Sequence, residues 1–324
     1  MLTVGWQAAG NPGAQSGARA LALRLVALLP AAALALEPVR LSAPTAAAGA
    51  NAAADDGLHV FWRLDKAVGG HLFLLGSLHF GDERLYPLPG VIEDAYREAA
   101  EIVFETDLRQ TMQPGFAELM RVRAELTPPT TLAEVIPAAM IESFRAVARE
   151  LGVEPLYLER FRAWYCANQL MSLALRRAGV DSRRGIDQVF CARAVSDGKP
   201  IETLETPAFQ VELFAGLAEP QAAALLTESL VEVSQVREFV ERMLTAYVHG
   251  DLQALGDLVA ASFDGAPELR RRFLTDRNAT WMPALEALAR RDGSQFIVVG
   301  TGHLLGDDGV ITRLRLAGHR VTRL

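Results

Sequence analysis

The chain has 324 residues, of which 50% are apolar, and its formal net charge at pH 7 is -7. This length and apolar content suffice for a sizeable buried core and exclude a wholly disordered chain. The basic residues are nearly all arginine and form no cluster, so nucleic acid is not an expected partner.

The first 54 residues are interpreted as a signal peptide followed by an Ala-rich linker. Arg19 and Arg24 precede an apolar run over 25–36, which is too short to span a bilayer, and small residues follow it. We therefore expect a periplasmic or secreted protein with no integral membrane span in the mature chain. A disordered Ala-rich tail is the alternative interpretation. Residues 55–324 are expected to form a single domain.

The first part of this domain is predicted to contribute strands. Residues 59–64 and 71–79 are expected to pair as a hairpin around a turn at 68–70. Helical spacing of apolar residues follows over 91–100, and the next apolar run, 102–107, is predicted to be a third strand.

Residues 110–195 are expected to form a large helical insertion. Thr131 and Glu134 make a capping box at the start of one predicted helix, and Pro137 lies after its first turn. A further helix is predicted over 159–177.

The remainder of the chain alternates between helices and strands. Strands are predicted over 199–206, 296–299 and 319–324, and helices over 220–248, 251–261, 268–291 and 310–316. The fold class is therefore α/β (α+β-like), with a mixed central β-sheet wrapped by helices.

Two histidines follow apolar strands in the same local pattern. One strand leads into Gly76-Ser77-Leu78-His79 and the other into Gly300-Thr301-Gly302-His303, so both have the form strand, Gly-x-x-His. Ligands of open α/β sheets bind outside the carboxyl ends of the strands. We call each Gly-x-x-His segment a box and the strand before it a box strand. We expect the two box strands to be parallel and adjacent or nearly so, with the imidazoles roughly 4 to 8 Å apart.

Two glutamates close other predicted strands. Glu105 ends the third strand, and Glu205 ends the strand over 199–206. Two imidazoles and one carboxylate form the ligand set of an open catalytic metal site. We expect His79, His303 and either Glu105 or Glu205 to bind Zn, Mn or Co. The other glutamate would take a proton from the metal-bound water.

The order of these motifs resembles the TraB/GumN family. The resemblance covers residues 61–324 and rests on the two boxes and on the following segments: Trp62, Phe104-Glu105-Thr106-Asp107, Arg184-Gly185-Ile186-Asp187, Leu204-Glu205-Thr206 and Arg277-Asn278. It implies an erythromycin-esterase-like fold and a relationship to the Tiki metalloproteases, whose active sites are attributed to the Gly-x-x-His boxes and a glutamate. It also implies that Arg277 stabilises an oxyanion and that Asn278 orients the substrate.

Each candidate residue also has an ordinary structural interpretation. A histidine at a strand end often only satisfies a backbone hydrogen bond, and Glu105 and Glu205 could be solvated carboxylates. Arg184 and Asp187, three residues apart at a helix start, most simply form a local ion pair, with a supporting role at the site as the alternative. Cys166 and Cys191 could form a disulfide or remain as buried thiols.

These observations favour an exported hydrolase, in particular a metal-dependent peptidase, acting on a peptide or small-molecule substrate. One alternative is a non-catalytic protein of the same fold that binds haem or another small molecule. Another is a metal-independent hydrolase in which a histidine is the general base.

Overall fold

The computed structural model describes residues 57–324, in which six strands form one mixed sheet. The predicted signal peptide, residues 1–54, lies outside the described residues. The strands are β1 (Phe61–Asp65), β2 (His71–Ser77), β3 (Glu101–Phe104), β4 (Ile201–Thr203), β5 (Gln295–Gly300) and β6 (Val321–Arg323). Their order across the sheet is β4-β3-β5-β2-β1-β6. The predicted α/β class with a mixed central sheet is thus confirmed.

The centre of the sheet is parallel. β5 pairs in parallel with β2 on one side and with β3 on the other, and β4 extends the parallel part beyond β3. β1 is antiparallel to both β2 and β6. The prediction that the two Gly-x-x-His strands lie parallel and adjacent is therefore confirmed, with Ser77 opposite Gly300.

Both box strands lie in the interior. All residues of β5 are buried, and in β2 only His71 is partly exposed. A parallel strand that is covered on both faces needs an uninterrupted apolar run. For this reason the two apolar runs predicted buried strands from the sequence alone. Polar residues follow directly after these two strands, so they lie at the carboxyl edge of the sheet.

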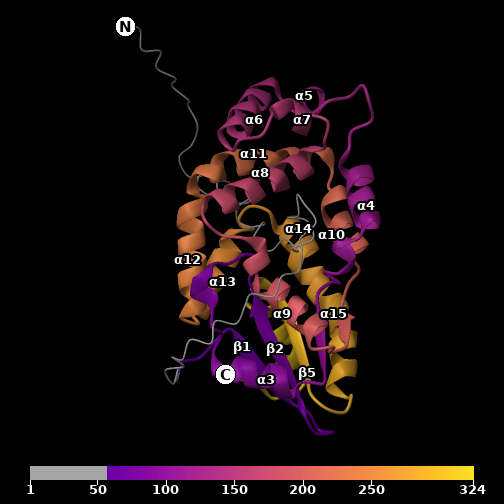
Figure 1. Ribbon diagram of the computed structural model, residues 1–324, viewed down its shortest axis with the longest axis vertical. Coiled ribbons are helices and arrows are strands. Elements are labelled where there is room, and N and C mark those ends of the chain that lie inside the picture. Colours follow the sequence, from indigo (N-terminus) through magenta and orange to yellow (C-terminus); the bar gives the residue numbers. More distant parts are fainter. Residues whose placement is uncertain (1–56) are drawn as a thin grey trace.

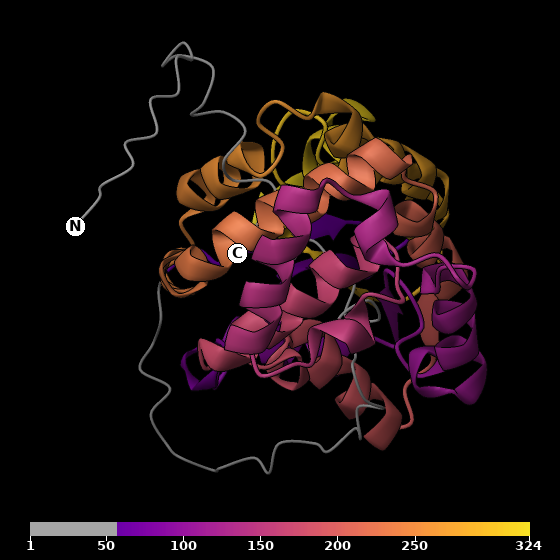
Figure 2. The ribbon, with the colours of Figure 1, turned by 90° about the horizontal axis from the view of Figure 1, so that it is seen from above.

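Helices surround this sheet and continue far beyond its carboxyl edge (Figure 1). They are α3 (Gly90–Glu98), α4 (Pro114–Ala124), α5 (Leu132–Val135), α6 (Ala138–Glu150), α7 (Pro155–Leu158), α8 (Ala163–Arg177), α9 (Ile186–Ser196), α10 (Pro207–Ala215), α11 (Glu219–Glu232), α12 (Val236–Val248), α13 (Leu252–Ala261), α14 (Pro267–Arg270), α15 (Asp276–Ala289), α16 (Thr301–Leu304) and α17 (Val310–Leu316). Seen from above, the helices cover the strands (Figure 2). Within residues 57–324, no helix combines the length and apolarity needed to cross a bilayer.

Three predicted helices are interrupted. Pro137 separates α5 from α6, because proline has no N–H to donate and its ring clashes with the preceding turn. The capping box prediction was wrong, since the Thr131 side chain makes no capping hydrogen bond. The helix predicted over 220–248 is divided into α11 and α12 by a 3-10 turn, Val233–Gln235.

The third interruption bears on the site. The helix predicted over 268–291 consists of α14, a π-helical turn η5 (Arg271–Thr275), and α15. Such π turns are uncommon and often occur at functional sites. Here the turn ends two residues before Arg277, which is buried together with Asn278.

Candidate active site

Four predicted site residues converge at the carboxyl edge of the sheet. His79 follows β2, Glu105 follows β3, Glu205 follows β4, and His303 lies in α16 directly after β5. A backbone hydrogen bond of 2.7 Å from Glu205 to Glu105 holds the two glutamates side by side. All four side chains are at least nine-tenths buried.

The two imidazoles border the same space. A methyl group built on Gly300 would lie 3.3 Å from Nε2 of His79, 3.6 Å from Cδ2 of His303 and 3.1 Å from Oε1 of Glu105. One point therefore touches all three predicted metal ligands. The glycine at this position leaves that point open.

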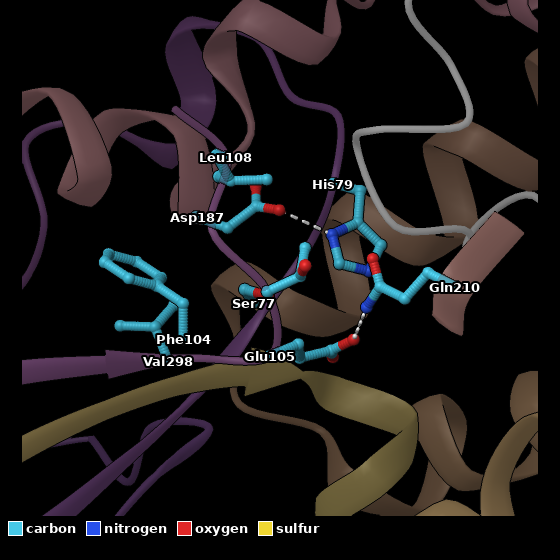
Figure 3. Close-up of a pocket in the computed structure, with 9 residues that line it drawn as sticks. Ser77, His79, Phe104, Glu105, Leu108, Asp187, Gln210 and Val298 are labelled. Carbon is cyan, nitrogen blue, oxygen red and sulfur yellow. Dashed lines mark hydrogen bonds and ion pairs between the residues drawn. The ribbon is translucent and has the colours of Figure 1, made fainter. Parts of the chain in front are cut away.

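His79 is paired with Asp187 on α9. The distance from Nδ1 of His79 to Oδ2 of Asp187 is 2.7 Å, and both side chains are buried (Figure 3). An ionised carboxylate only accepts, so Nδ1 carries the proton and Nε2 holds the lone pair of the neutral ring. Burial lowers the pKa of His79, but the charge and hydrogen bond of Asp187, with a further contribution from Glu105, outweigh burial and raise it above its usual value.

The predicted ion pair between Arg184 and Asp187 was wrong. Arg184 lies at the surface, where its guanidinium is 3.8 Å from Glu83, whereas Asp187 faces His79. The reason is the close approach of the chain at Gly185, where an added Cβ would lie 2.8 Å from the backbone of His79. The N–H of Ile186 then donates to Leu78, which fixes the start of α9 against the first box.

Arg277 is the centre of a buried polar network. Its Nε donates to Glu205 at 2.8 Å, and its Nη2 donates to Glu105 at 2.7 Å and to Glu205 at 2.8 Å. Its Nη1 donates to the carbonyl oxygen of Phe273 at 3.1 Å and to Nε2 of His303 at 2.9 Å. These contacts use all the N–H donors of a guanidinium, so none remains for an oxyanion in this arrangement.

His303 is held as a neutral acceptor. Its Nδ1 lies 2.6 Å from Oδ1 of Asn278, and its Nε2 accepts from Arg277. Burial and the positive charge of Arg277 lower the pKa of His303 to about 3. The amide of Asn278 also donates to the carbonyl oxygen of Asp308 at 3.0 Å, so Asn278 orients the histidine.

Trp281 completes this network and was not predicted as a site residue. Its Nε1 donates to Glu205 at 2.8 Å, and its ring lies 4.3 Å from that of His303. It follows Arg277 by four residues on α15, so helical spacing places both on one face. That spacing was the only signal for it in the sequence.

Glu105 is ionised. Burial raises its pKa, but neighbouring charges, including Arg277, and the backbone N–H of Gly300 outweigh this and lower it to about 2. The Gly300 N–H donates to Oε1 at 2.6 Å. Both carboxylate oxygens of Glu105 thus already accept hydrogen bonds.

The expected metal ligands do not fit a metal ion as they are arranged here. The lone pair of His303 points at an arginine N–H, and both Glu105 oxygens are engaged. Among residues 57–324, no three His, Cys, Asp or Glu side chains are grouped so as to hold a metal. Of the three ligands, only His79 offers an unengaged atom, Nε2.

A partly open cavity lies beside His79 (Figure 3). It encloses about 240 Å³ including its open mouth, and its inner part has room for about one water molecule. Four of its polar lining atoms are buried without a hydrogen-bond partner in the described structure: Nε2 of His79, Oγ of Ser77, Oγ1 of Thr106 and Oε1 of Gln210. Buried polar atoms are normally paired, so water or a polar ligand in the cavity would satisfy these four atoms.

The comparisons with known proteins identify the family of this chain. A family model described as the TraB/PrgY/gumN family matches residues 60–323. The chain belongs to the TraB/PrgY/gumN family. The match includes both Gly-x-x-His boxes, both glutamates, Asp187 and Arg277.

Two relatives in this family carry the same name. The uncharacterized protein YbaP of Escherichia coli K12 is 24% identical over 262 residues, which cover 80% of this chain and 94% of the relative. YbaP of Shigella flexneri gives the same figures. No solved structure matches the chain.

Neither cysteine is among the residues that line the cavity beside His79. Cys166 and Cys191 are both buried free thiols, so of the two alternatives the structure shows the free thiols. Burial raises the pKa of the Cys191 thiol to about 12, which makes it a poor nucleophile.

Proposed function

We propose that this protein is a hydrolase in which His79 is the general base and Asp187 positions it. The observation that carries the proposal is the 2.7 Å contact from Asp187 to Nδ1, which leaves Nε2 as a lone pair facing the cavity. General bases of this kind typically accept a proton from water within hydrogen-bond reach. The inner part of the cavity has the size for that water.

The reaction uses groups that line the cavity. Nε2 of His79 takes a proton from water while the water oxygen bonds to the substrate carbonyl carbon. The hydroxyls of Ser77 and Thr106 have no partner in the described structure and are oriented by the substrate, so either can donate to the oxyanion. When the bond to the leaving group breaks, His79 returns the proton to that group, and Asp187 stabilises the imidazolium in between.

The second network has a supporting role in this proposal. Arg277 pairs with both Glu105 and Glu205 and leaves His303 uncharged, so these side chains hold one another in place at the edge of the cavity. Asn278 and Trp281 fix His303 and Glu205. These residues position the cavity wall, and the direct proton transfer falls to His79.

A metal-dependent peptidase is the function that the resemblance implies. It would require Arg277 to release His303 before a metal could bind between His79, His303 and Glu105. The fixed geometry favours the metal-independent route, and no step above uses a metal. Haem binding is not proposed either, because the cavity beside His79 is far smaller than a porphyrin needs.

Export and the erythromycin-esterase-like fold remain predictions. The first concerns residues 1–54, which lie outside the described residues, and the second rests on the family resemblance. The proposal about His79 depends on neither.

The test is hydrolysis of a peptide library and of small amides and esters by the purified protein. Each assay is run after exhaustive chelation and again with added Zn, Mn or Co. We expect activity that survives chelation and is lost in His79→Gln. Cleavage that requires an added metal would overturn the metal-independent mechanism, and the absence of cleavage under every condition would overturn the hydrolase.

A further inference from the structure

Among the described residues that line the cavity beside His79, Gln210 on α10 is the one with a carboxamide side chain. Its side chain is buried, with 1% exposure. Its Nε2 donates to Oε2 of Glu205 at 3.2 Å and to Oε2 of Glu105 at 3.5 Å. Figure 3 shows the amide beside His79, on the side away from Asp187.

These two contacts fix which way the amide points. Glu105 and Glu205 both pair with Arg277, and ionised carboxylates are acceptors only. Rotating the amide by half a turn would place its oxygen against two carboxylate oxygens, and its N–H groups would lose their acceptors. The nitrogen therefore stays on the glutamates, and Oε1 stays on the cavity side.

Oε1 of Gln210 differs from the other unpaired atoms of the cavity. The hydroxyls of Ser77 and Thr106 rotate and can donate or accept, and Nε2 of His79 changes role with protonation. A carboxamide oxygen can only accept. It has no partner in the part of the chain that the structure describes, so a donor on a molecule bound in the cavity would satisfy it.

We propose that Gln210 determines substrate specificity by accepting an N–H from the group that enters the cavity. This inference rests on the proposed hydrolase and names its substrate class as amides that carry an N–H, in preference to esters and N-alkylated amides. A site built to hydrogen-bond an N–H discriminates strongly against an analogue without it, because its own acceptor is then left buried and unpaired.

The first experiment compares a secondary amide, which carries one N–H, with its N-methylated tertiary counterpart, which carries none; both have the same acyl group. For the wild type we expect kcat/KM for the N–H amide to exceed kcat/KM for the N-methylated amide by roughly 10²-fold or more. Gln210→Met keeps the length of the side chain and removes the acceptor, so the ratio should fall toward one. Gln253→Met, on the exposed side of α13, is the matched control and should keep the wild-type ratio.

The second experiment does not depend on turnover. The melting temperature is measured with equal concentrations of acetamide, N-methylacetamide and N,N-dimethylacetamide. The first two carry an N–H and should stabilise the wild type, whereas N,N-dimethylacetamide should not, and Gln210→Met should abolish the difference.

The outcomes separate this inference from the proposed function. Ligand discrimination without any hydrolysis would support the acceptor and overturn the hydrolase. Hydrolysis with equal rates for the two amides would overturn the role of Gln210 alone. Both wild-type comparisons stand even where Gln210→Met does not fold.

Discussion

Asp187 contacts His79 across 108 positions of sequence, with 2.7 Å between Oδ2 and Nδ1. The contact determines both the tautomer and the basicity of the histidine. It joins α9, at the end of the helical region, to the first Gly-x-x-His box. The proposed general base therefore exists only when these two parts of the chain are packed together.

Replacing Asp187 with Asn should shift the pH dependence of activity. Asp187 raises the pKa of His79, and the base must be neutral, so wild-type activity should rise with pH through a value above 6.5. In Asp187→Asn the rising limb should move to lower pH, and kcat/KM at the optimum should fall by roughly 10²-fold. NMR titration of the His79 ring gives the same shift without substrate. An unchanged His79 pKa in the variant would contradict the assigned role of Asp187.

Removing Arg277 should destabilise the fold far more than removing a surface arginine. Arg277→Met leaves Glu105 and Glu205 buried without their cation, which should cost about 3 to 5 kcal/mol of unfolding free energy. Urea denaturation measures this. Arg290→Met removes an exposed pair with Glu286 and should cost less than about 1 kcal/mol. Equal losses in the two variants would show that the buried network is not a stabilising unit.

A methyl group at Gly300 should block the site while leaving the chain folded. The added Cβ would lie 3.1 Å from Glu105 and 3.3 Å from His79, in the space proposed for the reaction. We expect Gly300→Ala to lose most activity and about 1 to 3 kcal/mol of stability, as in a modestly overpacked core. Gly256→Ala, in α13 with nothing within 4 Å, should keep full activity and gain about 0.5 to 1 kcal/mol. Activity and thermal unfolding are measured on both, and an active Gly300→Ala would place the reaction elsewhere.

Acid should destabilise the protein in two steps. In the folded protein the pKa of His303 is lowered to about 3, whereas in the unfolded chain it keeps its usual value near 6.5. The unfolded chain therefore takes up a proton at a higher pH than the folded protein does, and stability falls as the pH drops below 6.5. The pKa of Glu105 is lowered from 4.5 to about 2, so its stabilising contribution is complete above 4.5 and is lost as the pH falls toward 2.

The Glu105→Gln variant isolates the second step. It should be less stable than the wild type at neutral pH, and its stability should change less between pH 4.5 and 2. The fall that begins near 6.5 should remain. Denaturant midpoints across this pH range provide the measurement, and identical slopes in both proteins below pH 4.5 would contradict an ionised, paired Glu105.

Several features of the fold were predictable because they depend on local pattern. Uninterrupted apolar runs indicated β2 and β5 as buried strands, and their shared ending placed two histidines at one edge of the sheet. Helix boundaries were less predictable. The capping hydrogen bond predicted at Thr131 did not form, and the helix ended after four residues, before Pro137.

By itself, the sequence determined four of the side chains that reach the site: His79, Glu105, Glu205 and His303 each follow a strand, and parallel strands bring their ends to one edge. Only the tertiary structure decided how these side chains are paired. Asp187 faces His79 instead of Arg184, and Arg277 takes the lone pair of His303 that a metal would need. A ligand set predicted from sequence specifies only residue types, whereas metal binding and proton transfer depend on which lone pairs remain free. Contacts between segments up to 195 positions apart settle this, and no local pattern records them.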